Sequence, residues 1–396
     1  MNKIFLSVVI ASRFGVAISG ILKGIATLSL AMTATVIMTV IANAQLLELK
    51  PLAGYKLGSE WIIIDELGNK LYSSPFILDV EEYYEGLLGA YIRYGNNVVS
   101  AYFDNSGEIV LATDSRKPYS FRNGRAFIVQ EVDAAKHEYI WGAINRAGKF
   151  VIPMNYIDIT EFSEGLAYIM NLTERGFVDT NGKFVFKLDS GFAGYGFREG
   201  LSPVSDANIG KFAFVDKTGK VVIDYKFDEV GFFSEGLARA FSLNAQNKGA
   251  FGYINKSGNY VIDNQFEEAS NFSEGLAFVA VLDITASHFL WAVINSDGVF
   301  ISEFKFRDFK NFSEGFAAVR DEDLLWRYID KTANFIDDNS YKFCGSFVDG
   351  KALVITVDDE KMFINKSGRK VIEIPVEAEI VFDFRTNEKY TGRIRN

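Results

Sequence analysis

The chain has 396 residues, of which 48% are hydrophobic and 15% aromatic, with only six prolines. This composition is that of a globular protein and excludes a disordered or collagen-like chain. Lysine and arginine total 41 against 51 acidic residues, a formal net charge of −10, which argues against a general affinity for nucleic acid or anionic lipid and leaves room only for local basic patches.

Residues 1–44 differ in character from the rest of the chain, because they carry only three charged side chains. Their apolar run 25–42 ends in Ala42-Asn43-Ala44, which is typical of a secretory signal peptide and its cleavage site. A retained membrane anchor is the alternative, since the run of 18 residues just reaches the length that spans a bilayer. The small residues at the cleavage positions favour cleavage. Both interpretations predict an exported protein that is periplasmic, extracellular or associated with the envelope.

After a lead-in over 45–59 and a hairpin over Glu60–Tyr72, one motif recurs along the chain, an aromatic residue followed by any residue, an acid and a glycine. The eight glycines lie (350 − 86)/7, or about 38, residues apart on average, and a fixed period of this size indicates a tandem repeat. The acids are Glu85, Glu164, Glu199, Glu235, Glu274, Glu314 and Asp349, with Asn123 in the remaining copy, and the glycines are Gly86, Gly124, Gly165, Gly200, Gly236, Gly275, Gly315 and Gly350.

The second half of each unit ends in a hairpin turn that begins with Asp or Asn and closes with glycine three residues later, as in Asn255-Lys256-Ser257-Gly258. The first side chain accepts hydrogen bonds from backbone N–H groups two or three residues on, and the glycine supplies the positive φ that the turn needs. Of nine such turns, only the one ending at Ala333 lacks the glycine. That hairpin is expected either to move its left-handed position to Asn334 or to carry strain.

Three or four short strands fit into each unit, and so small a sheet cannot shield both of its faces, so neighbouring units must stack. In one unit the strands are expected over Leu237–Phe241, Gly252–Asn255 and Tyr260–Asp263, with a weaker fourth over Gln265–Ala269. The predicted fold class is therefore all-β, built from tandem antiparallel meanders that form either a β-propeller-like ring or an open curved β-solenoid.

Three segments are expected along the chain, a leader over 1–44, the repeat array over 60–373, and a terminal strand with a frayed tail over 374–396. The array begins with the second half of a repeat unit, because the hairpin over Glu60–Tyr72 has no acid–Gly motif before it. At the other end, the terminal strand Ala378–Phe384 is not part of a complete unit. Two incomplete ends are able to complement one another, and such pairing would close a ring.

Catalytic chemistry is poorly provided for in this sequence. The two histidines, His137 and His288, lie in variable loops at unrelated repeat positions, and the chain contains no nucleophile elbow, phosphate loop or metalloprotease motif. We therefore expect no catalytic residue, no cofactor and no metal site. The alternative is an envelope hydrolase or carbohydrate-active enzyme that uses loop acids such as Asp206 or Asp283. The lone Cys344 is expected to be a buried small hydrophobe.

The repeated acid has two interpretations. In the first, the side chain accepts backbone N–H bonds and fixes the turn in which it stands, which every unit would need. In the second, the acids form a row of negative charge presented to a cation or a basic partner. The first is favoured, because a short acid beside a turn glycine has a local role available to it.

The tryptophans pose a similar choice. Trp141, Trp291 and Trp326 could stack against sugar rings, but they recur at one position just before a strand, which favours packing in the core. Repeat proteins usually bind through loops that converge on one surface, so the place of the loops over 130–140, 243–250 and 282–290 matters for function.

The stretch Trp141-Gly142-Ala143-Ile144-Asn145-Arg146-Ala147-Gly148 resembles the bacterial WG repeat family. The resemblance covers about 60–373, although only Trp141-Gly142 keeps the naming dipeptide. Membership would imply a repeat scaffold without an assigned reaction. The expected function is accordingly a non-catalytic binding scaffold of the bacterial cell envelope that mediates protein–protein or glycan interactions, with no nucleic-acid partner and with membrane contact only through an N-terminal anchor.

Overall fold

The computed structural model describes residues 50–133, 135–189, 192–243, 246–285 and 287–391, and within these ranges it contains strands and turns but no helix. The expected leader over 1–44 lies outside the described residues. Within the described part of the chain, no helix has the length and apolar character required to cross a bilayer. The all-β class predicted from the sequence is confirmed.

The repeating element is a twisted antiparallel sheet of four strands. In β19–β22 the strands are hydrogen-bonded in chain order, from Glu229–Val230 (β19) through Ala238–Leu243 (β20) and Gly249–Ile254 (β21) to Tyr260–Phe266 (β22). Alternating burial along β22 follows from the period of two in a strand. The same order holds in β4–β7 (Ile77–Tyr84, Leu87–Tyr94, Asn97–Phe103, Ile109–Thr113), β11–β14 (Asp158–Ile159, Leu166–Met170, Arg175–Asp179, Phe184–Lys187) and β15–β18 (Phe192–Gly194, Leu201–Asp206, Lys211–Asp216, Val221–Phe227).

Shorter versions of the same sheet complete most of the array. Three strands remain in β8–β10 (Arg125–Asp133, Glu138–Asn145, Phe150–Tyr156) and in β23–β25 (Glu268–Ala269, Leu276–Asp283, His288–Asn295). A seven-stranded sheet combines β26–β28 (Asp308–Phe309, Phe316–Arg320, Trp326–Asp330) with β29–β32 (Tyr341–Cys344, Lys351–Thr356, Lys361–Asn365, Lys370–Ile374). Only the pair Trp326 and Tyr341 joins its two halves, so these count as two units.

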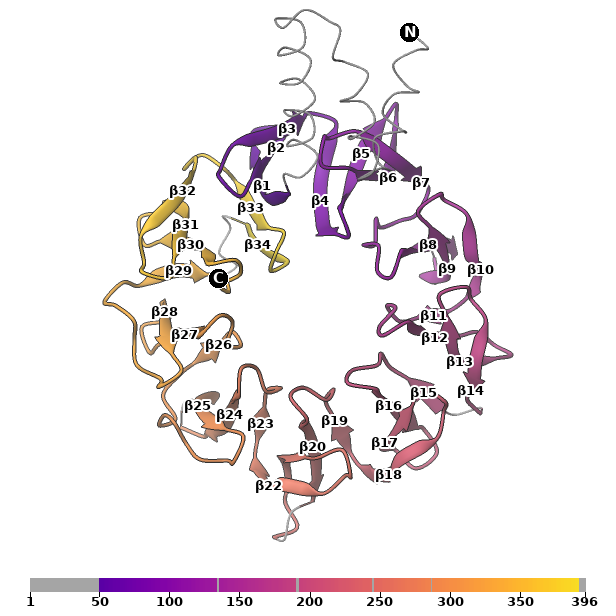
Figure 1. Cartoon of the computed structure of the whole chain (residues 1–396), viewed down its shortest axis with the longest axis vertical. Coiled ribbons are helices and arrows are strands. Elements are labelled where there is room, and N and C mark those ends of the chain that lie inside the picture. The colour runs from indigo at the N-terminus through magenta and orange to yellow at the C-terminus, as the bar shows by residue number, and fades with distance from the viewer. Residues whose placement is uncertain (1–49, 134, 190–191, 244–245, 286, 392–396) are drawn as a thin grey trace, which may run out of the picture. The chain divides into compact units, whose positions relative to one another are not determined.

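The two ends of the array share one sheet, which closes the ring. Strands β1 (Pro51–Leu57), β2 (Glu60–Asp65) and β3 (Lys70–Ser74) combine with β33 (Ile380–Asp383) and β34 (Glu388–Thr391) in the order β3-β2-β1-β33-β34. Ala53 is paired with Asp383 and Tyr55 with Val381. Of the two architectures left open by the sequence, the ring is therefore the one observed (Figure 1). It also takes in residues expected to be a lead-in (β1) and a frayed tail (β34).

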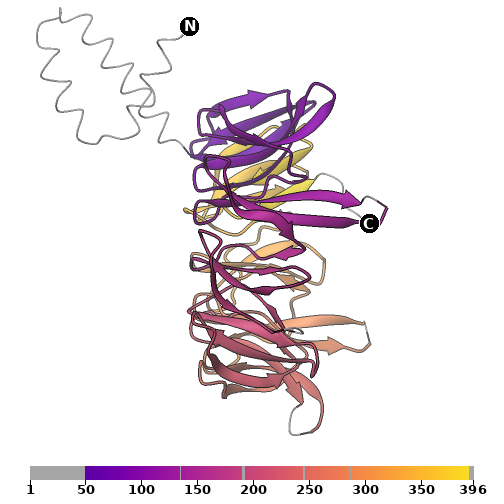
Figure 2. The same cartoon turned by 90° about the vertical axis from the view of Figure 1, so that its right-hand side faces the viewer.

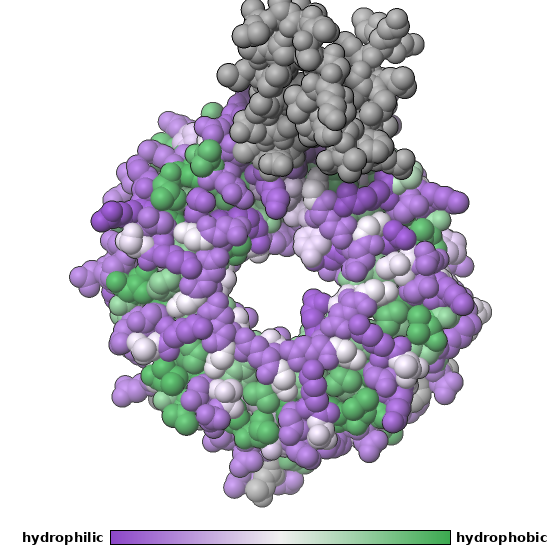
Figure 3. Space-filling model, in the orientation of Figure 1, coloured by the Kyte–Doolittle hydropathy of each residue, from purple (hydrophilic) through white to green (hydrophobic). Residues whose placement is uncertain are grey.

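The described strands thus form nine sheet units around a central opening, whose rim is mostly hydrophilic (Figure 3). The units interlock along the chain. The weak fourth strand expected at the end of one sequence unit is observed as β23, but it pairs with β24 of the next sheet and not with β22. Each sequence unit in this part of the ring therefore contributes the innermost strand of the following sheet.

Aromatic side chains fill the wedges between neighbouring sheets. Phe272, the aromatic residue of its acid–Gly motif, is almost fully buried and meets Tyr253 of the preceding sheet edge to face at 4.7 Å between centroids. The equivalent contact joins Phe233 to Phe214 at 4.9 Å. Such pairs stabilise the packing beyond the area that they bury. Phe233 and Phe272 are thus core residues.

In the turn that ends at Ala333, the alanine itself adopts the left-handed conformation that glycine has in the other turns. Ala333 has φ 60°, so the position does not move to Asn334, and the Asp330 side chain still accepts bonds from the backbone N–H groups of Thr332 and Asn334 at 2.8 and 3.1 Å. The alanine methyl is buried in the cluster around Ile329. Of the two outcomes expected for this hairpin, the structure shows the strained one.

Candidate functional site

The ring has two faces with different loops. The acid–Gly turns and the Asp/Asn-x-x-Gly turns lie together on what we term the turn face, since side chains of the two sets contact one another. The hairpins that connect the second and third strands of the four-stranded sheets, and the equivalent hairpins β8–β9 and β24–β25 of the three-stranded sheets, lie on the opposite side, the hairpin face. Figure 2 shows the long hairpins β8–β9, β20–β21 and β24–β25 extending to one side. The described parts of the loops over 130–140, 243–250 and 282–290 therefore share one face, because they occupy one position of the repeat.

On the turn face, the repeated acids connect each sheet to the next. The carboxylate of Glu274 accepts a bond from Gly315 N at 2.8 Å and forms an ion pair with Lys331 at 3.2 Å, and both partners belong to the following sheet. We call this arrangement the inter-sheet latch. Backbone bonds of the same kind run from Gly124 to Glu85, Gly200 to Glu164, Gly236 to Glu199, Gly275 to Glu235 and Gly350 to Glu314.

This finding changes the role expected for the acids. The favoured interpretation had each carboxylate fix its own turn, but the backbone of that turn is already self-paired, with Ser163 N bonded to Leu166 O at 2.8 Å and Leu166 N to Ser163 O at 3.1 Å. Glu164 and Gly165 both have positive φ, at 53° and 86°, as a two-residue type I′ turn requires. The acid is therefore free to reach the next sheet.

The row of negative charge is matched by a row of cations. Ion pairs join Glu85 to Arg146, Glu164 to Lys217, Glu199 to Lys256 and Glu314 to Lys366 at 2.9–3.2 Å. Glu235 has a serine, Ser296, where the others have a cation, and accepts bonds from the N–H groups of both Glu274 and Gly275. Asp349 precedes the closing sheet, where Arg385 bonds the Val348 carbonyl.

Three of the latch carboxylates, those of Glu164, Glu274 and Glu314, have a pKa below the usual value of a glutamate. Partial burial raises the pKa of Glu274, but the Gly315 N–H and the Lys331 ammonium outweigh it and hold the net pKa below its usual value of 4.5. The pKa values of Glu164 and Glu314 are lowered for the same reasons. A depressed carboxyl pKa contributes stability that is present above the unfolded-state pKa and is lost as pH falls through the folded one.

We therefore expect Glu274→Ala to lower the free energy of unfolding by about 1–2 kcal/mol near neutral pH, because it removes a charge-assisted backbone bond and a partly exposed ion pair. The difference from the parent chain should shrink in acid, where the carboxyl becomes protonated. Urea unfolding at neutral and at acid pH measures it. Lys331→Ala, which removes only the ion pair, is the matched control and should cost less. An equal loss for Glu274→Ala at both pH values would contradict this account.

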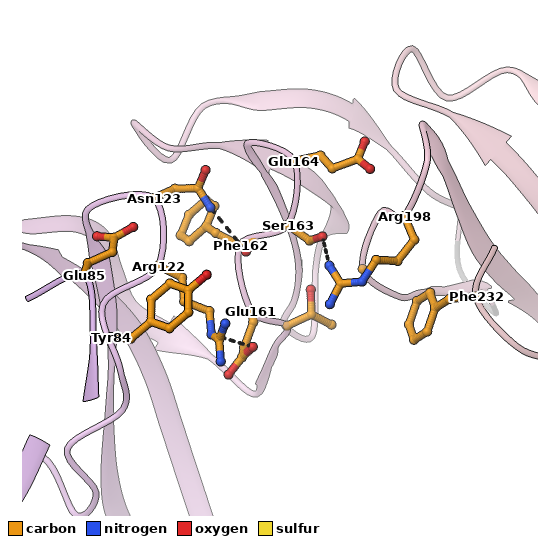
Figure 4. Close-up of a pocket in the computed structure, with 12 residues that line it drawn as sticks. Tyr84, Glu85, Arg122, Asn123, Glu161, Phe162, Ser163, Glu164, Arg198 and Phe232 are labelled. Carbon is orange, nitrogen blue, oxygen red and sulfur yellow. Dashed lines mark hydrogen bonds and ion pairs between the residues drawn. The ribbon is translucent and has the colours of Figure 1, made fainter. Parts of the chain in front are cut away.

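A cavity of about 680 Å³ opens on the turn face, and its lining comes from five successive sheets, from the one that contains β4 to the one that contains β19; we call it the arginine pocket (Figure 4). Its polar groups come from successive acid–Gly motifs, and its rings are Tyr84, Phe162 and Phe232. Arg122 enters from one side, forms ion pairs with Glu161 at 2.9 Å and Glu82 at 3.1 Å, and lies 4.3 Å from the centre of the Tyr84 ring.

Arg198 lies on the other side of the arginine pocket. Its guanidinium donates to Ser163 Oγ and lies 5.9 Å from the centre of the Phe232 ring, as Figure 4 shows. Within the described residues, Arg198 forms no ion pair with a carboxylate. The two guanidinium groups therefore differ, since the first is paired with two glutamates and the second is held only by neutral groups.

A second cavity, of about 340 Å³, lies at the base of the β8–β9 hairpin and is termed the aromatic cleft. Trp141 and Tyr119 meet in it with ring centres 5.4 Å apart. Arg116 lies 5.1 Å from the centre of the Tyr139 ring and donates to the Tyr139 hydroxyl at 2.6 Å. Tyr91, Lys117 and Val129 complete the lining. Burial, with the Glu81 carboxylate, raises the pKa of Tyr91 to about 12, so this phenol stays a donor at neutral pH.

The predicted residues of the WG dipeptide have distinct roles. Trp141 is half-buried, packs against the cluster around Phe127 and also lines the aromatic cleft, so it lies only partly in the core. A side chain at Gly142 would meet the Ile152 carbonyl oxygen at 2.8 Å, so this glycine permits the close approach of β10. Trp291 packs on Phe309 at 4.5 Å and belongs with the core.

The remaining singled-out residues have local partners. Trp326 packs against the cluster around Tyr328, and His288 contacts Arg307. Asp206 accepts a bond from Asn208 N at 2.8 Å and Asp283 from Thr285 N at 2.9 Å, each within its own loop. Cys344 is fully buried, as expected, and burial raises its pKa. Nowhere in the described ranges do three or more His, Cys, Asp or Glu side chains gather as a metal site would require.

The arginine pocket was not foreseen, although a signal for it is present in the sequence. The residue after the motif phenylalanine is serine at 163, 234, 273 and 313, and arginine only at 122 and 198. A comparison of the copies position by position would have shown these two departures from the repeat. Which cavity they line depends on packing between sheets, and the sequence alone does not give that.

A closed ring of nine small antiparallel sheet units, arranged in chain order around a central opening, defines the protein as a β-propeller. More particularly, the chain carries WG repeats. The family profile described as "WG containing repeat" matches residues 141–171, 176–208, 212–241, 251–281 and 291–324. Each match begins in the strand that follows a hairpin-face loop, such as β9 or β13, and ends in or shortly after the strand that precedes the next such loop, so the sequence repeat straddles two sheets.

No curated protein matches the sequence. Among solved structures, the chain is similar to BamB from Moraxella catarrhalis, with 11% identity and a TM-score of 0.37 over 79% of this chain and 91% of that one. A protein of unknown function from Bacteroides caccae matches at 11% identity and a TM-score of 0.22, over 55% and 94%. Oligopeptidase B from Trypanosoma brucei matches at 8% identity and a TM-score of 0.35, over 77% and 53%. At these scores the likenesses carry no argument about function.

Proposed function

We propose that this protein is a non-catalytic binding scaffold of the bacterial cell envelope, and that its hairpin face contacts a protein or glycan partner. The observation that carries the proposal is the aromatic cleft at the base of the β8–β9 hairpin, which projects from this face (Figure 2). Four aromatic rings line it, and ring faces of this kind stack on sugar rings and on the side chains of protein partners. The matched WG repeats form part of the ring, and Trp141, the first residue of the first match, lines the cleft.

Polar groups in the cleft suit recognition better than bond cleavage. The Arg116 guanidinium forms an ion pair with Glu131 at 3.0 Å and the Lys117 ammonium one with Glu81 at 3.3 Å, so the cleft presents paired charges beside its rings. Within the described residues, Trp141 Nε1 has no hydrogen-bond partner and is available to a ligand oxygen. An aromatic floor with a few donors at its edge is the usual composition of a binding pocket.

Export and the absence of catalysis are parts of the same proposal. The apolar run 25–42 and the small residues that follow it support an exported protein, attached to the membrane only if the leader is retained. The loop acids Asp206 and Asp283, the candidates for a hydrolase, are each engaged by backbone N–H groups of their own loops. That engagement favours a structural role for them.

The proposal is tested by probing the purified full chain with a glycan array and with solubilised bacterial envelope protein, and by repeating both with Tyr139→Ala and Arg116→Ala. We expect either substitution to weaken binding at least tenfold, since each removes a contact of about 1.4 kcal/mol or more. Tyr94→Ala is the matched control, because Tyr94 is 74% exposed in the neighbouring β5–β6 hairpin but does not line the cleft.

Two results would overturn the proposal. One is binding that Tyr139→Ala and Arg116→Ala leave unchanged, which would place the contact elsewhere. The other is turnover of an envelope glycan or peptide by the purified chain that Asp283→Asn or Asp206→Asn abolishes, which would establish the hydrolase.

A further inference from the structure

The arginine pocket exists because three positions depart from the repeat. Arg122 and Arg198 stand where four other copies have serine. Gly196 stands where Asn271 and Asn311 occur in later copies. The only heavy atom within 4 Å of a Cβ placed on Gly196, apart from its chain neighbours, is the Ser163 Cβ at 3.6 Å, so the missing side chain leaves open space in the lining. The pocket therefore replaces packing that other copies of the motif contain.

The charged side chains that line the arginine pocket differ in whether they form an ion pair. Arg122 already has Glu161 and Glu82 as partners. The carboxylates of Glu85 and Glu164 are taken by the inter-sheet latch, which pairs them with Arg146 and Lys217. Arg198 alone among the charged groups of the lining has no partner of opposite charge in the described part of the chain, and its guanidinium is held beside Ser163 Oγ. A guanidinium fixed in this way is suited to bind an anion through two parallel N–H donors.

The surroundings of Arg198 select among anions. Three carboxylates, those of Glu85, Glu161 and Glu164, line the same cavity, and their field opposes a dianion such as phosphate more strongly than a monoanion. The rings of Tyr84 and Phe232 offer apolar and aromatic contact. The volume of about 680 Å³ is that of a pocket for a small organic ligand. A single carboxylate attached to an aromatic or branched apolar group satisfies all three features.

We propose that the arginine pocket binds a monocarboxylate with an aromatic or apolar body, and that the carboxylate is bound by Arg198 with Ser163 beside it, while the body lies against Phe232. The carboxylate belongs either to a free small acid or to the C-terminal residue of a peptide, which share this chemistry. The site lies on the turn face and is separate from the partner contact proposed for the hairpin face. Neither assignment requires the other.

The test uses the purified full chain and two probes, N-acetyl-4-fluorophenylalanine and a pentapeptide that ends in 4-fluorophenylalanine with a free carboxylate. Fluorine NMR measures their binding, and the C-terminal amide of each probe is the chemical control. Arg198→Ser introduces the residue that four other copies have at this position, so the fold is compatible with it. Gly196→Asn, also taken from other copies, fills the cavity and leaves the arginine in place. Arg369→Ser, at an exposed turn residue on the same face, is the matched control.

The parent chain and Arg369→Ser should bind at least one free acid, and Arg198→Ser and Gly196→Asn should each weaken that binding at least tenfold, with the amides binding as weakly as the variants. Tighter binding of the peptide assigns the site to peptide C-termini, and equal or tighter binding of the single amino acid assigns it to free acids. Unchanged binding in Arg198→Ser overturns the proposal, as does the absence of binding to both probes. Displacement of the probes by inorganic phosphate at a lower concentration than by acetate also overturns it. Circular dichroism of each variant shows that the ring is retained.

Discussion

Arg385→Met is expected to lower the free energy of unfolding by about 3–5 kcal/mol, because it leaves a buried carboxylate without its cation. Asp383 is fully buried in the closing sheet, and its side chain receives two bonds from the Arg385 guanidinium, at 3.0 and 2.7 Å, and one from the Arg385 backbone N–H at 3.0 Å. The same guanidinium donates to the Val348 carbonyl of the neighbouring unit. One side chain thus neutralises a buried charge and joins the last sheet to the first.

The pH dependence of this variant has a definite sign. Burial raises the pKa of Asp383 above its usual value of 3.8 even with Arg385 present, and removal of the cation raises it further. A carboxyl whose folded pKa is raised contributes stability that is complete below the unfolded pKa and is lost as pH rises through the folded one. The loss caused by Arg385→Met should therefore be largest near neutral pH and should diminish in acid.

Chemical unfolding of the purified chain between about pH 4 and pH 7 measures the effect. The double variant Asp383→Leu with Arg385→Met is the control, because it removes both charges and should lose less than the single variant. If the single variant is within 0.5 kcal/mol of the parent chain, a magnitude typical of surface substitutions, the ion pair does not stabilise the closure.

Gly182→Ala is expected to cost about 3 kcal/mol or more, the second largest effect. Gly182 ends the turn between β13 and β14, has φ 78°, and a methyl on it would overlap the backbone carbonyl oxygen of Val151 in the preceding sheet. The left-handed conformation alone costs a non-glycine residue about 1–2 kcal/mol, and the steric overlap with rigid backbone adds to it.

Gly200→Ala separates the two contributions. Gly200 has φ 82°, close to that of Gly182, but a methyl on it would have no atom within 4 Å beyond its chain neighbours. It should lose only the conformational part, about 1–2 kcal/mol. Thermal unfolding of both variants, at equal protein concentration, gives the comparison. Equal losses would show that the close approach between sheets contributes nothing, and the tolerated methyl at Ala333 would then be typical of these turns.

Local sequence signals predicted the units of this fold well. Strand alternation, the Asp/Asn-x-x-Gly turns and the acid–Gly motif depend on residues close together in the chain, and in the structure they lie in the sheets and turns expected of them. The unmatched strands at the two ends also indicated that closure was available. A repeated sequence makes strands and turns easier to predict, because every copy of the motif adopts the same local structure.

Contacts between units were harder to predict. The sequence showed that an acid recurs beside a turn glycine, but it did not show that Gly315 and Lys331, 41 and 57 residues after Glu274, are its partners. The sequence also did not show that Arg198 contacts Ser163 or that the two residues line a cavity, because the formation of a cavity depends on how neighbouring sheets pack. Propensity and spacing describe a unit in isolation, whereas the candidate sites lie between units.

The closing sheet also sets an order of events for the newly made chain. One edge of β1 pairs with β2, but its other edge pairs with β33, whose first residue, Ile380, is made more than 300 positions after β1 ends at Leu57. Until then β1 presents an unpaired strand edge, the kind of surface through which unfinished chains associate. A chain truncated before Ile380 would retain most of its sheets and yet stay open, so aggregation of nascent or truncated molecules, more than loss of any single sheet, is the hazard that this design creates.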